Sequence, residues 1–234
     1  MKLLAFETAT EACSVALYLD GEVRERFGVV PRRHAELALP WAQELLAEAG
    51  IARAQLDAIA VGRGPGAFTG VRLAIALAQG IALALERPLV PVSTLQVLAA
   101  GAAADGPDRI LAAIDARMGE VYVGAYEREG GRLRALDREQ VLAPEAVRLP
   151  VASGAWQGVG TGFAAADGLL AQRLAGEMVA VDPAALPRAA VLARLAASAC
   201  EAGEAVPAER VEPAYLRDNV ALTLAEQQAL RASR

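Results

Sequence analysis

The sequence VGRGPGAFTGVR, residues 61–72, decides the fold class of this chain. A run with a strand pattern, Asp57 to Val61, leads into it, and the Ala-rich run that follows predicts a helix at 70–86. A strand, a glycine turn and a helix start bring unpaired backbone N–H groups together beside the positive end of the helix dipole. This arrangement is typical of an anion-binding turn in an α/β protein.

The glycine turn lacks the lysine that phosphate-gripping loops place before their Ser or Thr. Lys2 is the only lysine in the chain. We therefore interpret the turn as built for backbone contact, with at most a weak or vestigial nucleotide site. The residues assigned to that site come from this turn and from the turn after the first strand: Glu7, Thr8, Gly64, Gly66, Thr69 and Gly70.

Composition argues against several functions. A net charge of −5 over 234 residues disfavours unaided nucleic-acid binding. One histidine and two distant cysteines predict neither a transition-metal site nor a disulfide framework, so we expect no metal and no cofactor. Counting alone leaves a carboxylate-only magnesium site open. The longest apolar stretch, 73–85, is too short to span a bilayer, and Met1 leads directly into a strand. We expect a soluble, cytoplasmic protein without a membrane partner.

The strand pattern repeats along the chain. A strand at residues 2–6 is followed by a hairpin, and a strand–turn–strand pattern returns at residue 109. This predicts an α/β fold with two lobes on a common plan. The boundaries are placed at 1–104 and 105–211, with part of 212–234 joining the first lobe. Residues 150–163 are rich in glycine and are expected to form a loop.

Helix 70–86 carries two rows of small residues. The row Ala74, Ala78 and Ala82 suits packing on the helix's own sheet, and a second small row lets another helix approach closely. Helix 35–49 adds an apolar stripe, and its Pro40 implies a late start or a kink. The two helices predict a partner-binding face made of Leu37, Trp41, Leu45, Val71, Ala76, Gly80 and Ala84.

Two further features keep alternative interpretations. His34, at the start of the first helix, is either a surface or cap residue or a residue of a partner contact or site rim. The cluster DARMGEVY at 115–122 is either a lobe-closing network of salt bridges or a contact surface.

Several motifs in the same order resemble one known family. They are residues 1–19 (MKLLAFETATEACSVALYL), 63–74 (RGPGAFTGVRLA), 115–122 (DARMGEVY) and 212–221 (EPAYLRDNVA). Together, and nearly end to end, the chain resembles the bacterial TsaB (YeaZ) family. The resemblance implies a two-lobed actin-like ATPase fold (ASKHA, ribonuclease H-like) with duplicated mixed sheets. It also implies a role in making threonylcarbamoyladenosine on tRNA.

The same resemblance implies the partners. Members pair as a heterodimer with the catalytic threonylcarbamoyl transferase subunit, TsaD, are joined by the ATPase TsaE, and are also seen as homodimers. Contact with tRNA is expected only through the complex. In the catalytic subunit two histidines bind metal where this chain has Thr94 and Leu98, so we expect no catalytic residue and no activity of its own. The alternative is a stand-alone small-molecule kinase or ATPase of the same fold; a metalloprotease is the weaker third interpretation.

Overall fold

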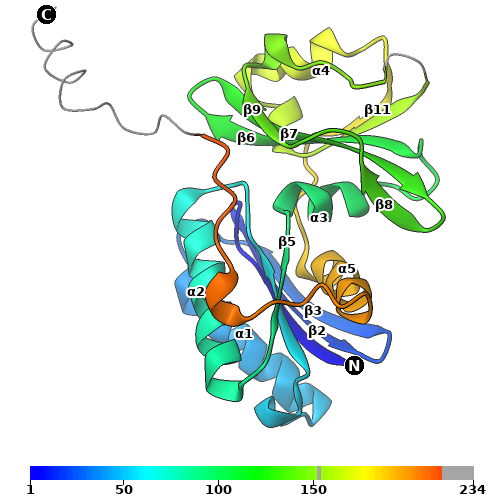
Figure 1. Cartoon of the computed structure of the whole chain (residues 1–234). Helices are drawn as coiled ribbons and strands as arrows, with labels where there is room; N and C mark the ends of the chain where they lie inside the picture. Colours follow the sequence, from blue (N-terminus) through cyan, green and yellow to red (C-terminus); the bar gives the residue numbers. More distant parts are fainter. Residues whose placement is uncertain (152–153, 218–234) are drawn as a thin grey trace, which may run out of the picture.

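The computed structural model describes residues 1–151 and 154–217 and contains two mixed β-sheets, one above the other in Figure 1. The first sheet has five strands, in the spatial order β3 (Glu22–Val29), β2 (Ala12–Leu19), β1 (Lys2–Glu7), β4 (Ala58–Gly62) and β5 (Leu89–Val92). Neighbours from β3 to β1 are antiparallel, and neighbours from β1 to β5 are parallel.

The second sheet repeats this plan. Its path is β8 (Arg132–Ala135), β7 (Glu120–Glu129), β6 (Arg109–Arg117), β10 (Trp156–Val159) and β11 (Met178–Asp182), with β9 (Gln140–Leu142) also paired to β7. Neighbours from β8 to β6 are antiparallel, and neighbours from β6 to β11 are parallel. The same succession of pairings in both sheets confirms the predicted fold of duplicated mixed sheets.

Side-chain alternation along the strands decides which helix covers which face. In β1, Leu4 and Phe6 point to the face covered by α1 (His34–Ala49) and α2 (Phe68–Leu85). Leu3 and Ala5 point to the opposite face, which α5 (Ala189–Glu201) covers. Because both faces are buried, the central strands are almost continuously apolar, as is usual for parallel strands between helix layers.

The second sheet is likewise covered on both faces. Ile110 and Ala112 of β6 pack against α3 (Thr94–Ala100), and Leu111 and Ala113 face the cluster that contains Leu170 of α4 (Leu169–Arg173). Five short 3-10 helices complete the described elements: Arg53–Gln55, Pro144–Ala146, Thr161–Phe163, Ala166–Gly168 and Ala208–Arg210.

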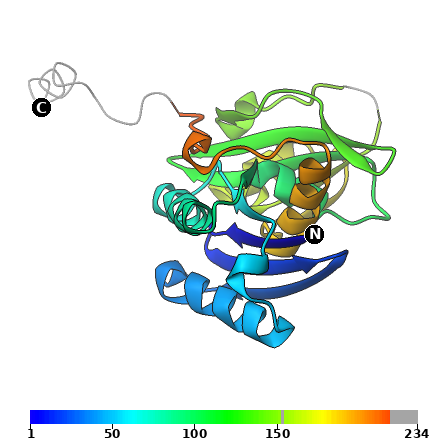
Figure 2. The same ribbon diagram turned by 60° about the horizontal axis from the view of Figure 1, so that its bottom comes forward.

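Helices α3 and α5 each pack on the sheet formed by the other half of the chain (Figures 1 and 2). The first, α3, lies within 1–104 but packs on the second sheet, and α5 lies within 105–211 but packs on the first. The hydroxyl of Ser14 in β2 accepts a hydrogen bond from the Ala189 N–H at 2.8 Å, and Glu25 accepts one from the Ala190 N–H at 3.1 Å. These side chains satisfy the first turn of α5 and hold it on the first sheet. The lobe boundaries stay a prediction, and of 212–234 only 212–217 are described.

Two local expectations need correction. Residues 150–163 were expected to be a loop, yet β10 lies there between β6 and β11. Gly158 fits this strand because a Cβ at that position would lie 2.4 Å from the Phe163 ring. Helix α1 begins at His34 and runs through Pro40 to Ala49, so the late start is wrong.

Helix α2 is long and apolar, and it is buried on one side. Among the described residues it is the single helix long and apolar enough to cross a membrane, judged by length and composition alone. The helix has 18 residues because it begins at Phe68, ahead of the apolar stretch at 73–85. One side is buried against the first sheet, through Ala74, Ala78 and Ala82, and much of the other side remains uncovered.

Candidate functional site

Backbone carbonyl groups from the turn after β1 pack against the glycine turn. A Cβ on Gly66 would lie 2.3 Å from the Ala9 carbonyl oxygen, and one on Gly70 would lie 2.0 Å from the Thr8 carbonyl oxygen. The Ala67 N–H donates a hydrogen bond of 2.7 Å to the same Ala9 oxygen. Glycine at these positions lets the glycine turn pack directly against the turn that follows β1. The backbone of the glycine turn therefore contacts another part of the same chain.

Glu7 is buried at the end of β1, with 1% of its surface exposed. Its carboxylate accepts hydrogen bonds from the Ala9 N–H at 2.9 Å and from the Thr94 hydroxyl at 3.1 Å. A Cβ on Gly62 would lie 1.9 Å from the Glu7 Oε2, so only glycine leaves room for this carboxylate. Burial raises the pKa of Glu7 to about 7, and the hydrogen bonds that oppose the shift come from neutral donors.

Two threonines complete this buried network. Thr94 also accepts a hydrogen bond from the Gly64 N–H at 3.2 Å, and Thr8 donates one of 2.7 Å to the Gly70 carbonyl. Both side chains have no exposed surface. The polar groups beside the glycine turn thus bind one another, which makes them structural in this conformation.

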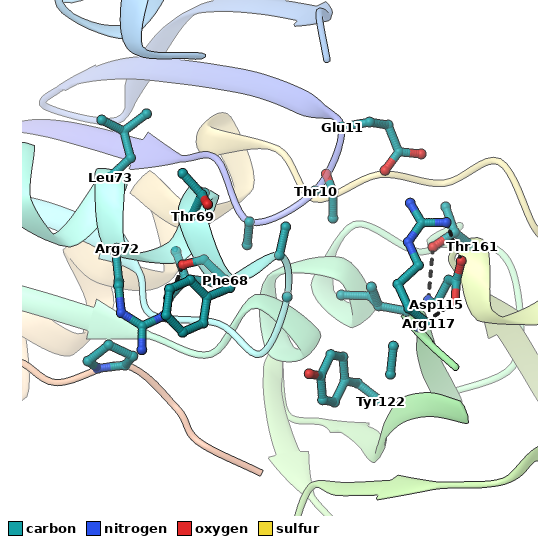
Figure 3. A pocket seen from close by; sticks show the side chains of 18 of the residues that line it. Thr10, Glu11, Phe68, Thr69, Arg72, Leu73, Asp115, Arg117, Tyr122 and Thr161 are labelled. Carbon is teal, nitrogen blue, oxygen red and sulfur yellow. Dashed lines mark hydrogen bonds and ion pairs between the residues drawn. The ribbon is translucent and has the colours of Figure 1, made fainter. Parts of the chain in front are cut away.

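A cavity of about 880 Å³ lies next to this network (Figure 3). Its walls come from both lobes and from the end of the described chain: 9–11, 31–32, 34–35, 66–73, 114–117, 122, 161, 164–165 and 213–217. Of the predicted nucleotide-site residues, Gly66, Thr69 and Gly70 line the cavity. Glu7, Thr8 and Gly64 do not, because they are packed behind the turn.

Arg72 and two aromatic rings form the part of the wall that sequence reasoning missed. The Arg72 guanidinium lies 3.3 Å from the ring centre of Phe68 and 5.1 Å from that of Tyr215, and it donates a hydrogen bond of 2.5 Å to the Tyr215 hydroxyl. Phe68 and Tyr215 are 67% and 59% exposed. The i, i+4 spacing of Phe68 and Arg72 on one helix face was the available signal.

The cavity offers mainly apolar side chains with scattered charges. Arg117 pairs with Asp115 at 2.8 Å. His34, the first residue of α1, also lines the wall, and its buried Nε2 has no hydrogen-bond partner within the described part of the chain. His34 is therefore both a helix-start residue and a rim residue. No group of three His, Cys, Asp or Glu side chains within 1–151 and 154–217 is placed to hold a metal.

The outward face of α2 carries the second row of small residues. Ala74, Ala78 and Ala82 have no exposed surface, whereas Ala76, Gly80 and Ala84 are exposed. A Cβ built on Gly80 would meet no atom within 4 Å, and Leu83 in the same helix is 60% exposed. The two rows thus lie on opposite sides of the helix, one against the sheet and one facing outward.

Two residues assigned to the partner face are core residues instead, and two more are partly buried against the core. Leu45 has no exposed surface and Val71 has 4%. Leu37 and Trp41 pack against the core of the first sheet, where a Cβ on Gly28 would lie 3.3 Å from the Trp41 ring. The stripe on α1 faces its own sheet because an amphipathic helix buries its apolar side first.

The cluster at 115–122 is joined by an ion pair to the end of the described chain. Arg217 donates hydrogen bonds to Glu120 at 2.5 Å and to the Ala116 carbonyl at 3.2 Å. Met118, between them in the turn, is 86% exposed. Both interpretations of this cluster therefore have support, a lobe-closing salt bridge and an exposed turn.

Comparison with known proteins identifies relatives along nearly the whole chain. The family model of TsaD, tRNA N6-adenosine threonylcarbamoyltransferase, matches residues 15–224. The tRNA threonylcarbamoyladenosine biosynthesis protein TsaB of Escherichia coli K12 is 45% identical over 94% of this chain and 96% of its own length. TsaB of Haemophilus influenzae is 38% identical, over 94% and 95%.

A solved structure agrees with these sequence relatives. YeaZ from Pseudomonas aeruginosa superposes with a TM-score of 0.83 at 47% identity, over 92% of this chain and 99% of that one. A second structure, described as an uncharacterized protein with similarity to peptidase YEAZ from the same organism, gives 0.84 at 47% identity over the same shares.

Proposed function

The chain belongs to the TsaB (YeaZ) family of tRNA threonylcarbamoyladenosine biosynthesis proteins, and on that premise we propose that it is the non-catalytic partner of the threonylcarbamoyl transferase subunit, TsaD. In this proposal it binds the catalytic subunit and holds it in an active arrangement. The chemistry takes place on the other subunit. The observation that carries the proposal is the uncovered small-residue face of α2.

The α2 face suits close helix packing. Ala76, Gly80 and Ala84 present almost no side chain, so a facing helix can approach the backbone closely. Leu83 and Phe68 lie at the two ends of the helix and are the large apolar side chains that such a contact would bury. Because the family model of the transferase also matches this chain, the favoured partner is a subunit of the same two-lobed fold.

The interior beside the glycine turn supports a role without chemistry. Thr94 stands where the resemblance puts a metal-binding histidine, and its hydroxyl is committed to Glu7 and Gly64. Leu98 stands at the second such position, is 3% exposed, and packs in the core between α3 and the second sheet. Both positions are used for packing, which leaves no side chain there to bind a metal or activate a substrate.

The remaining partners follow from the same proposal. A TsaE-like ATPase joins the heterodimer, and tRNA reaches this chain only through the complex, consistent with a net charge of −5. In the absence of the catalytic subunit, a second copy covers the α2 face, which gives a homodimer.

The test places a large charge on the α2 face. Ala76→Arg and Gly80→Arg should abolish co-purification with the catalytic subunit and should abolish tRNA modification by the mixture. Val179→Arg, at a position 68% exposed on the edge strand β11, is the matched control and should change neither. If binding and modification both survive in the α2 variants, the docking assignment is wrong.

The cavity between the lobes favours one alternative, a stand-alone small-molecule kinase or ATPase. Its volume of about 880 Å³ is sufficient for a nucleotide, and Arg72, Thr69 and Arg117 on its wall are groups that bind phosphate. Calorimetry of the isolated protein with ATP and Mg²⁺ separates the two functions. Micromolar binding together with turnover would favour the alternative, whereas the partner role requires neither.

A further inference from the structure

The last described segment, residues 204–217, forms a strap that runs from the first lobe to the second (Figure 1, orange to red). At its start, Val206 exchanges two backbone hydrogen bonds of 2.8 Å with Leu89 of β5. Further along, the side-chain amide of Gln79 in α2 donates to the carbonyls of Ala208 and Val211, at 2.9 and 3.1 Å. The first half of the strap is therefore fixed to β5 and α2.

The second half of the strap crosses to the other lobe. The Ala214 N–H donates a hydrogen bond of 2.8 Å to the Arg63 carbonyl, beside the glycine turn, and Tyr215 receives the hydrogen bond from Arg72. Arg217 then reaches the β6–β7 turn, where its guanidinium contacts Glu120, the Ala116 carbonyl and the Met118 sulfur. The side chains of Arg217 and Glu120 are 20% and 37% exposed, so this contact is partly shielded from water.

The described chain passes between the two sheets at two other places, at Ser93 between β5 and α3 and at 183–188 between β11 and α5. At the first, Ser93 donates a hydrogen bond to Glu139 of the second lobe. The strap spans the cavity instead, because residues 213–217 form part of its wall. Near α3 the two lobes are therefore connected covalently through the chain. On the cavity side they are connected by the contacts of Arg217.

We infer that the strap is a latch: the grip of Arg217 on the β6–β7 turn fixes the angle between the lobes and closes one wall of the cavity. A guanidinium that satisfies a carboxylate and a carbonyl in one turn holds the direction of its contact as well as its distance. Release of Arg217 leaves the described parts of the two lobes joined by the chain at Ser93 and 183–188 and by the contacts around α3, so they rotate and the cavity opens. This inference goes beyond the docking role and its test needs no partner.

The test measures the distance between the lobes in the full chain. Spin labels are placed at Arg53→Cys in the first lobe and Val179→Cys in the second, both exposed positions, in a Cys200→Ser background; Cys13 is fully buried and stays unlabelled. Dilution with unlabelled protein leaves only distances within one molecule. Pulsed electron paramagnetic resonance then gives the distribution of inter-lobe distances.

Arg217→Ala and Glu120→Ala remove the latch contact from its two sides, and both should shift and broaden the distance distribution. The matched control is Arg134→Ala, which removes ion pairs to Glu127 and Glu129 inside the second lobe and should leave the distribution narrow. Circular dichroism confirms that each variant is folded. An unchanged distribution in both latch variants, or an equal broadening in the control, overturns the inference.

Discussion

The hydroxyl of Thr94 donates a hydrogen bond of 3.1 Å to the carboxylate of Glu7, which joins the start of α3 to the end of β1. The Thr94 hydroxyl uses its remaining capacity on the Gly64 N–H, and Glu7 uses its second oxygen on the Ala9 N–H. Within the described residues, the hydrogen bonds that lower the pKa of Glu7 against the effect of burial come from neutral groups: the N–H groups of Ala9 and Thr8 and the Thr94 hydroxyl. The hydrogen bond between Thr94 and Glu7 therefore belongs to the packed interior beside the glycine turn. Because Glu7 titrates there, the free energy of unfolding should depend on pH.

The first prediction concerns the pH dependence of stability. The pKa of Glu7 is about 7 in the folded chain and near 4.5 in the unfolded chain, so the folded state binds more protons between these values. Stability from this group is fully present below pH 4.5 and is lost as the pH rises to about 7. We expect the free energy of unfolding to fall by up to about 3 kcal/mol relative to Glu7→Gln between pH 5 and pH 8.

Urea denaturation at both pH values checks this prediction. The exposed Glu22→Gln serves as control and should track the unmodified protein at each pH. A constant difference between the unmodified protein and Glu7→Gln would show that the carboxylate does not titrate in this range.

The second prediction concerns the docking of α5. Ser14 has no exposed surface, accepts from the Ala189 N–H and donates a hydrogen bond of 2.7 Å to Glu25. Ser14→Ala should lower the free energy of unfolding by about 1–2 kcal/mol, because it leaves a buried donor without a partner. Ser198→Ala, on the exposed side of the same helix, should have almost no effect. Equal effects in thermal unfolding would show that the Ser14 contact contributes nothing.

The third prediction separates the two rows of α2. Ala78 has no exposed surface, so Ala78→Leu should destabilise the chain by about 1–3 kcal/mol through overpacking. Ala76 is exposed, so Ala76→Leu should leave the stability of the isolated monomer within about 0.5 kcal/mol of the parent. Denaturant titration of the two variants side by side measures both effects, and a reversed order would mean that the rows are assigned to the wrong faces.

The fourth prediction uses Gly80, where stability and docking should change in opposite directions. A methyl group there meets no atom within 4 Å, so Gly80→Ala should stabilise the isolated chain by about 1 kcal/mol through helix propensity. The same methyl group should weaken binding to the catalytic subunit if a helix packs closely on this row. Calorimetric titration with that subunit is the check, and unchanged affinity would place the contact elsewhere.

The sequence predicted the parts of the fold that depend on local signals. The strand, glycine turn and helix at 57–86 follow from residue order alone, as does the repeated strand pattern at residue 109. By contrast, β10 was missed because Gly158 looks like a loop residue until Phe163 is known to fill the space above it. That contact joins two elements in three dimensions and leaves no pattern of period two in the sequence.

In the candidate site, too, features with a local sequence pattern were predicted and features that depend on tertiary contacts were not. The two small rows of α2 were predicted because their spacing is periodic, and the structure places one inward and one outward. In the α1 stripe, Leu45 is buried and Leu37 and Trp41 pack partly on the first sheet. Periodicity shows that a face is apolar but not what covers it. The contacts of Tyr215 and Arg217 join residues about 100 positions or more apart and could not be found from the sequence.

The most direct test of the central claim is the formation of threonylcarbamoyladenosine on tRNA, measured with this chain alone, with the catalytic subunit alone, and with the two mixed. The account predicts no product from this chain alone and a rate in the mixture that depends on it and is lost with Ala76→Arg. Product formed by the isolated chain, or full activity of the mixture with Ala76→Arg, would contradict it.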